Sequence, residues 1–153
     1  MKSYLYVMVE SIPVLIDGDE VYEILSLKDG ELNENENSVS AAGHLDWRNQ
    51  LLPIVNAREL LDMPCKDSSD MGAGIVYRIN LDQPPIFLVV DKVVQILELN
   101  LESFVQLPHV PEKVRRLFDS VYMDTSENRH AYRFRNPLPA IFLNGVVSSV
   151  TKH

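Results

Sequence analysis

Short apolar runs, broken by polar or proline-containing segments, recur along the whole chain. Runs of about four to eight residues rich in β-branched and aromatic side chains are typical of β-strands. The pattern predicts strands at residues 4–9, 12–16, 21–27, 44–47, 51–55, 74–81, 85–90, 91–99, 120–123, 130–134 and 138–143. For 21–27 a short helix is the alternative, and 91–99 suits a strand with a bend. We therefore expect an all-β chain, a barrel or a sandwich, with less than about a quarter of helix.

The stretch 43–64 combines several of these signals. Leu45 and Trp47 alternate with polar residues, which is typical of a half-buried strand, and we expect Trp47 in the core. Asn49-Gln50 is a polar break of hairpin length before the next apolar run. Pro53 lies inside that run and cannot donate a ladder hydrogen bond, so we expect an edge strand or a bulge there.

A short helix is predicted directly after this strand. Asn56 is a suitable N-cap, and Glu59 stands three residues later, at the spacing of a capping box. Residues 57–63 would form about two helical turns, and Pro64 would end them. Residues 112–118 suit either one helical turn or a connector.

Two polar segments separate the predicted strands. Residues 28–40 have almost no apolar side chains, so we expect a mobile loop there. Residues 66–74 contain glycines but lack the Gly-Lys-Ser/Thr of a phosphate-binding loop, and we interpret these glycines as turn residues.

The length, net charge and cysteine content of the chain narrow the class of protein. The chain has 153 residues, the size of a single domain, and 14 basic against 22 acidic residues give a net charge of −8. Such a chain repels phosphate backbones, so we expect no nucleic acid partner. The single cysteine, Cys65, fits a reducing compartment, and we find neither a signal peptide nor a run of the roughly 18 apolar residues that a membrane helix needs. We expect a cytoplasmic protein that is not an integral membrane protein.

No set of residues predicts catalysis. The four histidines are scattered and lack metal-ligand spacing, so we expect no enzyme, no metal and no cofactor. The run 129–135 mixes arginines with aromatic residues. In a strand, Arg133 and Arg135 would point to one side and Tyr132 and Phe134 to the other. A half-buried strand with a basic outer face, able to contact an acidic partner, is therefore favoured over a nucleic acid site.

The order of motifs carries a resemblance to a known family. The matching residues are, along the chain, Glu23 within 21–24, then Gly43, Arg48, Pro53, Asn56, Arg58 and Leu60-Leu61, and then Asp91 within 86–93. In this order they resemble the CheW family, the coupling proteins of bacterial chemotaxis. Three positions depart from its pattern: Asn49 stands where the family has Gly, Asn56 where it has Asp, and Asn144 where it tends to Asp.

The resemblance implies a fold and partners for one domain that spans 1–153. CheW-like proteins pair two five-stranded barrels of the Src-homology-3 type, which would draw mainly on 4–55 and on 74–143, with some strand exchange. They are adaptors without catalytic activity: a chemoreceptor's cytoplasmic tip enters the seam between the barrels, and a CheA-like histidine kinase meets an edge strand. The partner-binding residues that the resemblance implies are Glu23, Arg48, Asn49, Pro53, Asn56, Arg58 and Asp91.

Glu23 and Arg48 stand out among these. The resemblance places them on neighbouring strands of one barrel, so we expect an ion pair that orients Arg48 beside the receptor groove. The departures from the family pattern leave an alternative open. The chain would then be a CheW-like regulator of another motility or surface-sensing system that binds only one of the two partners.

Overall fold

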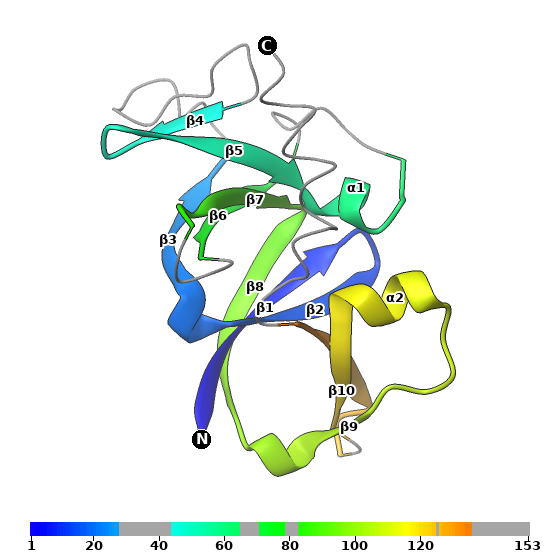
Figure 1. Ribbon diagram of the computed structural model, residues 1–153. Coiled ribbons are helices and arrows are strands. Elements are labelled where there is room, and N and C mark those ends of the chain that lie inside the picture. The colour runs from blue at the N-terminus through cyan, green and yellow to red at the C-terminus, as the bar shows by residue number, and fades with distance from the viewer. Residues whose placement is uncertain (28–43, 65–70, 79–82, 125, 136–153) are drawn as a thin grey trace.

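Eleven β-strands and two short α-helices make up most of the residues that the structure describes, which are 1–27, 44–64, 71–78, 83–124 and 126–135. The structure is a computed structural model (Figure 1). The strands form one six-stranded and one five-stranded sheet, and Figure 1 shows the five-stranded sheet above the other. The prediction of a mostly β chain with little helix is confirmed.

The six-stranded sheet has the order β8-β1-β2-β11-β10-β9. Its strands are β1 (Lys2–Val9), β2 (Ile12–Asp17), β8 (Lys92–Leu99), β9 (Phe104–Gln106), β10 (Phe118–Asp124) and β11 (Arg129–Phe134). Neighbours are antiparallel except β11 and β2, which run parallel with Tyr132 opposite Val14. The bend predicted in 91–99 corresponds to a register shift against β1, between Tyr6 and Val7.

The five-stranded sheet has the order β3-β6-β7-β5-β4. Its strands are β3 (Val21–Ser26), β4 (His44–Trp47), β5 (Gln50–Asn56), β6 (Ala73–Tyr77) and β7 (Ile86–Val90). β5 and β7 are parallel, and the other neighbours are antiparallel. Gly74 lies inside β6 and is buried, so its interpretation as a turn residue is wrong.

Both α-helices of the described residues directly adjoin a strand. α1 (Ala57–Leu60) follows β5, and α2 (Glu112–Leu117) precedes β10. The described residues also include two turns of 3-10 helix, η1 (Gly18–Glu20) and η4 (Leu101–Ser103). α1 is shorter than the predicted 57–63 because the chain turns at Asp62, which has a φ of 60°. Met63 N–H donates to the Arg58 carbonyl and Asp62 N–H to the Glu59 carbonyl, the hydrogen bonds of a Schellman cap.

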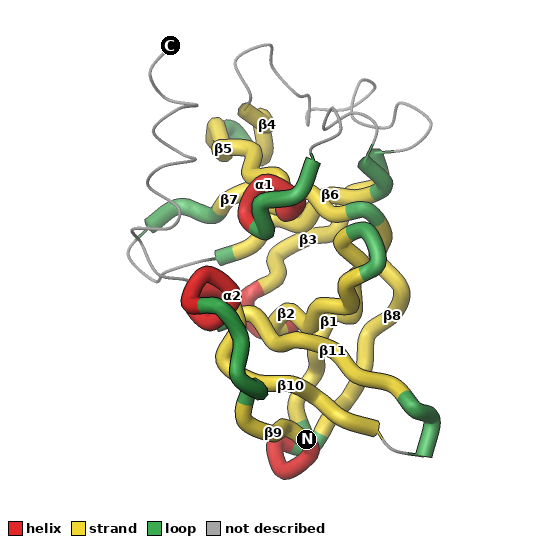
Figure 2. Tube along the Cα trace, turned by 90° about the vertical axis from the view of Figure 1, so that its right-hand side faces the viewer, coloured by secondary structure: helices red, strands yellow, loops and turns green. Residues whose placement is uncertain are grey.

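The largest hydrophobic core is shared by both sheets. It combines Leu5, Val7, Val14 and Ile16 of β1 and β2 with Val55, Ile75, Leu88 and Val90 of β5, β6 and β7. Leu60 of α1 is buried in the same core, and Figure 2 shows α1 against strands of the five-stranded sheet. Because these side chains leave water together, the two sheets are held as one unit.

Each sheet draws strands from both halves of the chain. β1 and β2 lie with β8–β11, whereas β6 and β7 lie with β3–β5. This exchange is larger than the division into 4–55 and 74–143 suggests. The predicted strand 138–143, the polar segment 28–40, Gly43, Cys65 and Asn144 lie outside the described residues.

Candidate functional site

The β4–β5 hairpin carries Arg48 and Asn49 at its tip. Trp47 pairs with Gln50, so the turn is Arg48-Asn49, one residue earlier than predicted. Both turn residues have positive φ, 48° and 63°, as a type I′ turn requires. Asn adopts this left-handed conformation more readily than most residues, which explains how Asn49 occupies a position where the resemblance expects Gly.

Glu23 of β3 holds the side chains at the base of this turn. Trp47 Nε1 donates a hydrogen bond to Glu23 Oε1 at 3.1 Å, and Arg48 Nη2 lies 3.5 Å from the same oxygen. The guanidinium carbon of Arg48 lies 4.5 Å from the centroid of the Trp47 ring, a cation–π contact. The predicted ion pair is present, and the Arg48 side chain stays 66% exposed.

The two strands that carry this contact are the edges of their sheet. β3 and β4 stand at opposite ends of the strand order, so the expectation that Glu23 and Arg48 lie on neighbouring strands is wrong for backbone pairing. The sheet curls until its edges meet through side chains, with the Tyr22 and Trp47 rings 5.9 Å apart. Side chains therefore make the closure that backbone hydrogen bonds do not.

Pro53 lies in β5, between β7 and β4, so the prediction of an edge strand is wrong. Pro53 is paired with His44 of β4, whereas pairing with β7 begins at Ile54. Pro53 thus stands just outside the β5–β7 ladder, where its missing N–H is tolerated.

A second group of predicted residues surrounds the start of α1. Asn56 Oδ1 accepts a hydrogen bond from the Arg58 backbone N–H at 2.9 Å, which confirms Asn56 as the N-cap. Arg58 forms a bidentate pair with Asp91, with Nε 3.0 Å from Oδ2 and Nη2 2.8 Å from Oδ1. The two side chains are only 10% and 16% exposed. Arg58 and Asp91 therefore form a largely buried ion pair that stabilises the fold.

Glu10, which sequence reasoning missed, completes this group. Its backbone N–H donates to Asp91 Oδ2 at 2.6 Å, and its carboxylate lies 3.8 Å from Arg58 Nη1. The group thus ties the β1–β2 turn and α1 to Asp91, between β7 and β8. The short gap between the first two predicted strands marks a tight turn, but nothing in the sequence links that turn to Asp91.

A groove with a volume of about 480 Å³ lies between β3, β6 and the start of β8. Its lining residues are Ile24, Leu25, Ser26, Gly72, Ala73, Asp91, Lys92 and Val93. Within the described residues, β3 pairs only with β6, and β8 only with β1. Apolar side chains on both edge strands are exposed, Ile24 on β3 by 40% and Ile96 on β8 by 65%. The groove thus lies between two edge strands that expose apolar groups.

The predicted site residues do not form one surface. Asp91 lines the groove, and Glu23 precedes Ile24 on its wall. Arg48 and Asn49 occupy the hairpin tip, while Pro53, Asn56 and Arg58 are not among the lining residues. Sequence reasoning missed Ile24 and Ile96. The signal for Ile96 was the apolar content of 91–99, which exceeds what one buried strand face needs.

Two kinds of feature are absent from the described residues. None of their His, Cys, Asp and Glu side chains form a group of three or more that could hold a metal ion. None of the helices in this part of the chain is long and apolar enough to cross a membrane.

Comparison with known proteins identifies the family. Residues 3–127 match the CheW-like domain. The chain belongs to the CheW-like domain family. A solved structure, the scaffolding protein TtCheW from Thermoanaerobacter tengcongensis, is similar in fold, with a TM-score of 0.65, 15% sequence identity and 88% of each chain covered. No curated protein matches the chain.

CheW-like domains are scaffolds of chemotaxis and not enzymes. The function of this CheW-like chain must therefore be sought on its surfaces. The structure offers two that lie close together along β3: the groove that begins at Ile24, and the exposed guanidinium of Arg48 beside Glu23.

Proposed function

We propose that this CheW-like chain couples a chemoreceptor to a CheA-like histidine kinase. The observation that carries the proposal is the groove between β3 and β8. Amphipathic helices bind in grooves with apolar walls, and the family resemblance implies a helical hairpin of the receptor tip as the occupant. Ile24 and Ile96 supply exposed apolar surface for such a helix.

Charged groups at the groove would set the orientation of the helix. Lys92 lines the groove and is exposed, and Asp91 beside it is fixed by Arg58. Arg48, held on one side by Glu23, keeps most of its guanidinium accessible to a partner. Apolar contact supplies affinity at an interface, while such charges at the rim favour one partner over another.

Kinase binding would use an edge strand. The main chain of an edge strand is unpaired on one side, so a domain of similar fold can continue the sheet there. Among the described residues, the edge strands β4 and β9 do not line the groove, so a kinase bound to either of them leaves the groove free for the receptor, which is what coupling two partners requires.

The test compares two exposed apolar residues of the six-stranded sheet. Ile96→Glu places a charge on β8, the strand whose start lines the groove, whereas Met123→Glu places one on β10, which does not line it. In a pull-down with purified receptor tip, we expect Ile96→Glu to weaken binding by at least about tenfold and Met123→Glu by less than about twofold. Equal effects of the two variants would contradict the proposed groove.

The same pull-down, repeated with the kinase, separates the two functions that the sequence left open. Binding to both partners supports coupling. Binding to the receptor alone, or to the kinase alone, would replace coupling by the alternative of a CheW-like regulator in another motility or surface-sensing system.

A further inference from the structure

A cleft separate from the groove lies where β9, α2 and β10 meet. Its volume is about 430 Å³, and its lining residues are Gln106, Leu107, Pro108, His109, Arg115, Asp119 and Arg135. Ligand pockets commonly measure ~300–1,000 Å³, so the cleft is large enough for a segment of peptide. None of these residues lines the groove between β3 and β8.

The cleft concentrates positive charge on an acidic protein. Arg115 of α2 and Arg135, just after β11, bring two guanidinium groups into its lining. The carboxylate in the lining, Asp119, is held by Arg133, whose Nε lies 2.7 Å from Oδ1. Among the described residues, neither Arg115 nor Arg135 forms an ion pair, although the whole chain carries a net charge of −8.

Arg135 is fixed in place by the end of α2. Its Nε donates to the Arg115 carbonyl at 2.7 Å, and its backbone N–H donates to the Leu117 carbonyl at 2.8 Å. A cation held by such bonds loses little freedom when it binds an anion. The arginine that sequence analysis placed on a basic outer face is thus a preorganised wall of the cleft.

We propose that this cleft binds an acidic peptide segment of a partner protein, whose carboxylates pair with Arg115 and Arg135. Guanidinium groups bind carboxylates through two parallel hydrogen bonds, which makes arginine suited to this role. Leu107 and Pro108 in the lining offer apolar contact that a peptide uses and an inorganic anion does not. The net charge of the chain opposes the alternative of a nucleic acid.

The test uses a fluorescein-labelled peptide in which glutamate alternates with valine, and a control peptide with glutamine at each glutamate position. Fluorescence anisotropy measures the affinity of the full chain for each. We expect the glutamate peptide to bind more tightly by at least about tenfold, and its affinity to fall as salt is added. Equal affinity for the two peptides, or binding by neither, would overturn the proposal.

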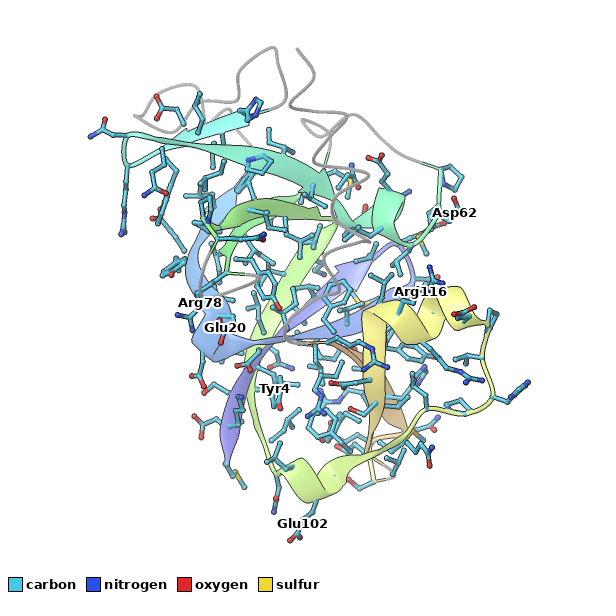
Figure 3. All side chains as sticks on the ribbon, viewed as in Figure 1. Tyr4, Glu20, Asp62, Arg78, Glu102 and Arg116 are labelled. Carbon is cyan, nitrogen blue, oxygen red and sulfur yellow. The ribbon has the colours of Figure 1, made fainter. Side chains whose placement is uncertain are left out.

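Two neighbouring arginines of α2 provide matched variants. Arg116 pairs with Glu112 at 3.2 Å and does not line the cleft; Figure 3 labels it on this helix. We expect Arg115→Gln to weaken binding of the glutamate peptide by about tenfold, the loss of one charged hydrogen-bonding group, and Arg116→Gln by less than about twofold. Arg115→Lys, which keeps the charge without the planar fork, should lie between them. Equal effects of the two glutamine variants would place the peptide elsewhere.

Two further measurements distinguish a peptide site from a small-anion site and from the receptor groove. Inorganic phosphate, compared with chloride at equal ionic strength, should not displace the glutamate peptide; displacement by phosphate would assign the cleft to small anions and overturn the proposal. Ile96→Glu should leave peptide binding unchanged, and Arg115→Gln should leave receptor binding unchanged. If each variant instead abolished both activities, the cleft would not be an independent site.

Discussion

At the scale of single residues, the five-stranded sheet depends on a close fit between Gly74 and Phe87. Both are buried, in the adjacent strands β6 and β7. A β-carbon built on Gly74 would overlap the ring of Phe87, so the ring occupies the space that any other side chain would need. Gly74 was visible in the sequence, but the reason for a glycine there was not. Phe87 lies next to Gly74 only because β6 and β7 pair, with Gly74 opposite Val89 and Phe87 opposite Val76.

We predict that Gly74→Ala lowers the free energy of unfolding by about 1–3 kcal/mol, the usual cost of overpacking a core. Urea denaturation measures it. Adding Phe87→Leu, which removes the far end of the ring, should cost less than the sum of the two single losses, since the added methyl group then has room. Additive losses would show that Gly74 and Phe87 are not in conflict.

Tyr77 places a hydroxyl group in the core, where none of the described residues forms a hydrogen bond with it. Its side chain is fully buried, and its hydroxyl has no hydrogen-bond partner among the described residues. Burial, aided by the nearby carboxylates of Asp17, Glu20 and Asp119, raises the pKa of Tyr77. We predict that Tyr77→Phe raises the free energy of unfolding by about 1 kcal/mol, because an unsatisfied hydroxyl is removed. Tyr22→Phe, at a half-exposed ring, is the control, and a destabilised Tyr77→Phe would reveal a missing partner.

At the scale of elements, the sequence predicted most of the strands but fewer of their relations. Alternation and β-branched runs depend on local side chains, so most strands up to 134 appear near their predicted positions. The hairpin turn was predicted at Asn49-Gln50 and lies at Arg48-Asn49. The residue types at these positions do not determine which two of them adopt positive φ. Pro53 was predicted to lie on an edge strand or at a bulge. The sequence could not show that β5 pairs with β7 only from Ile54 onward, which leaves Pro53 outside that ladder.

The network around Arg58 is the element-scale contact with the largest predicted effect. Removing one partner of a buried ion pair leaves a charge without compensation and costs about 3–5 kcal/mol. We therefore expect Asp91→Ala to lower the free energy of unfolding by about 3 kcal/mol, the low end of this range, because both side chains are slightly exposed and Glu10 still lies 3.8 Å from Arg58 Nη1. Chemical denaturation measures it.

Two variants show whether the unpaired charge causes this loss. Asp19→Ala, at a carboxylate that is 74% exposed, should change stability by less than about 0.5 kcal/mol. The double variant Arg58→Met/Asp91→Leu should be more stable than Asp91→Ala, because it leaves no buried charge. If it is less stable, the loss in Asp91→Ala comes from packing and not from the unpaired arginine.

At the scale of the whole molecule, the order of motifs was sufficient to predict the family and the mostly β fold. It was not sufficient to predict which strands pair with one another. β2 and β11 lie side by side although they are near opposite ends of the described chain, and such non-local pairing leaves no local signal. The groove and the basic cleft were missed for the same reason, since each is lined by residues from several distant segments.

The contact between Glu23 and Arg48 provides a test at this scale, since it joins the two edges of one sheet. We predict that Arg48→Glu weakens receptor binding while changing stability by less than about 1 kcal/mol, because the pair is exposed. Adding Glu23→Arg should restore part of the binding. Restoration is partial because Trp47 Nε1 loses its acceptor. A double variant that binds no better than Arg48→Glu would show that the two residues act independently.

The surroundings of Trp47 have a practical consequence. It is the single tryptophan of the chain, its indole N–H donates to Glu23, and the Arg48 guanidinium lies over its ring. The wavelength of maximum indole emission depends on the charges around the ring. A receptor that binds Arg48 or Glu23 and moves either side chain away from Trp47 therefore shifts this wavelength. The chain therefore carries its own optical reporter, and complex formation at this surface can be followed in unlabelled protein from its intrinsic fluorescence alone.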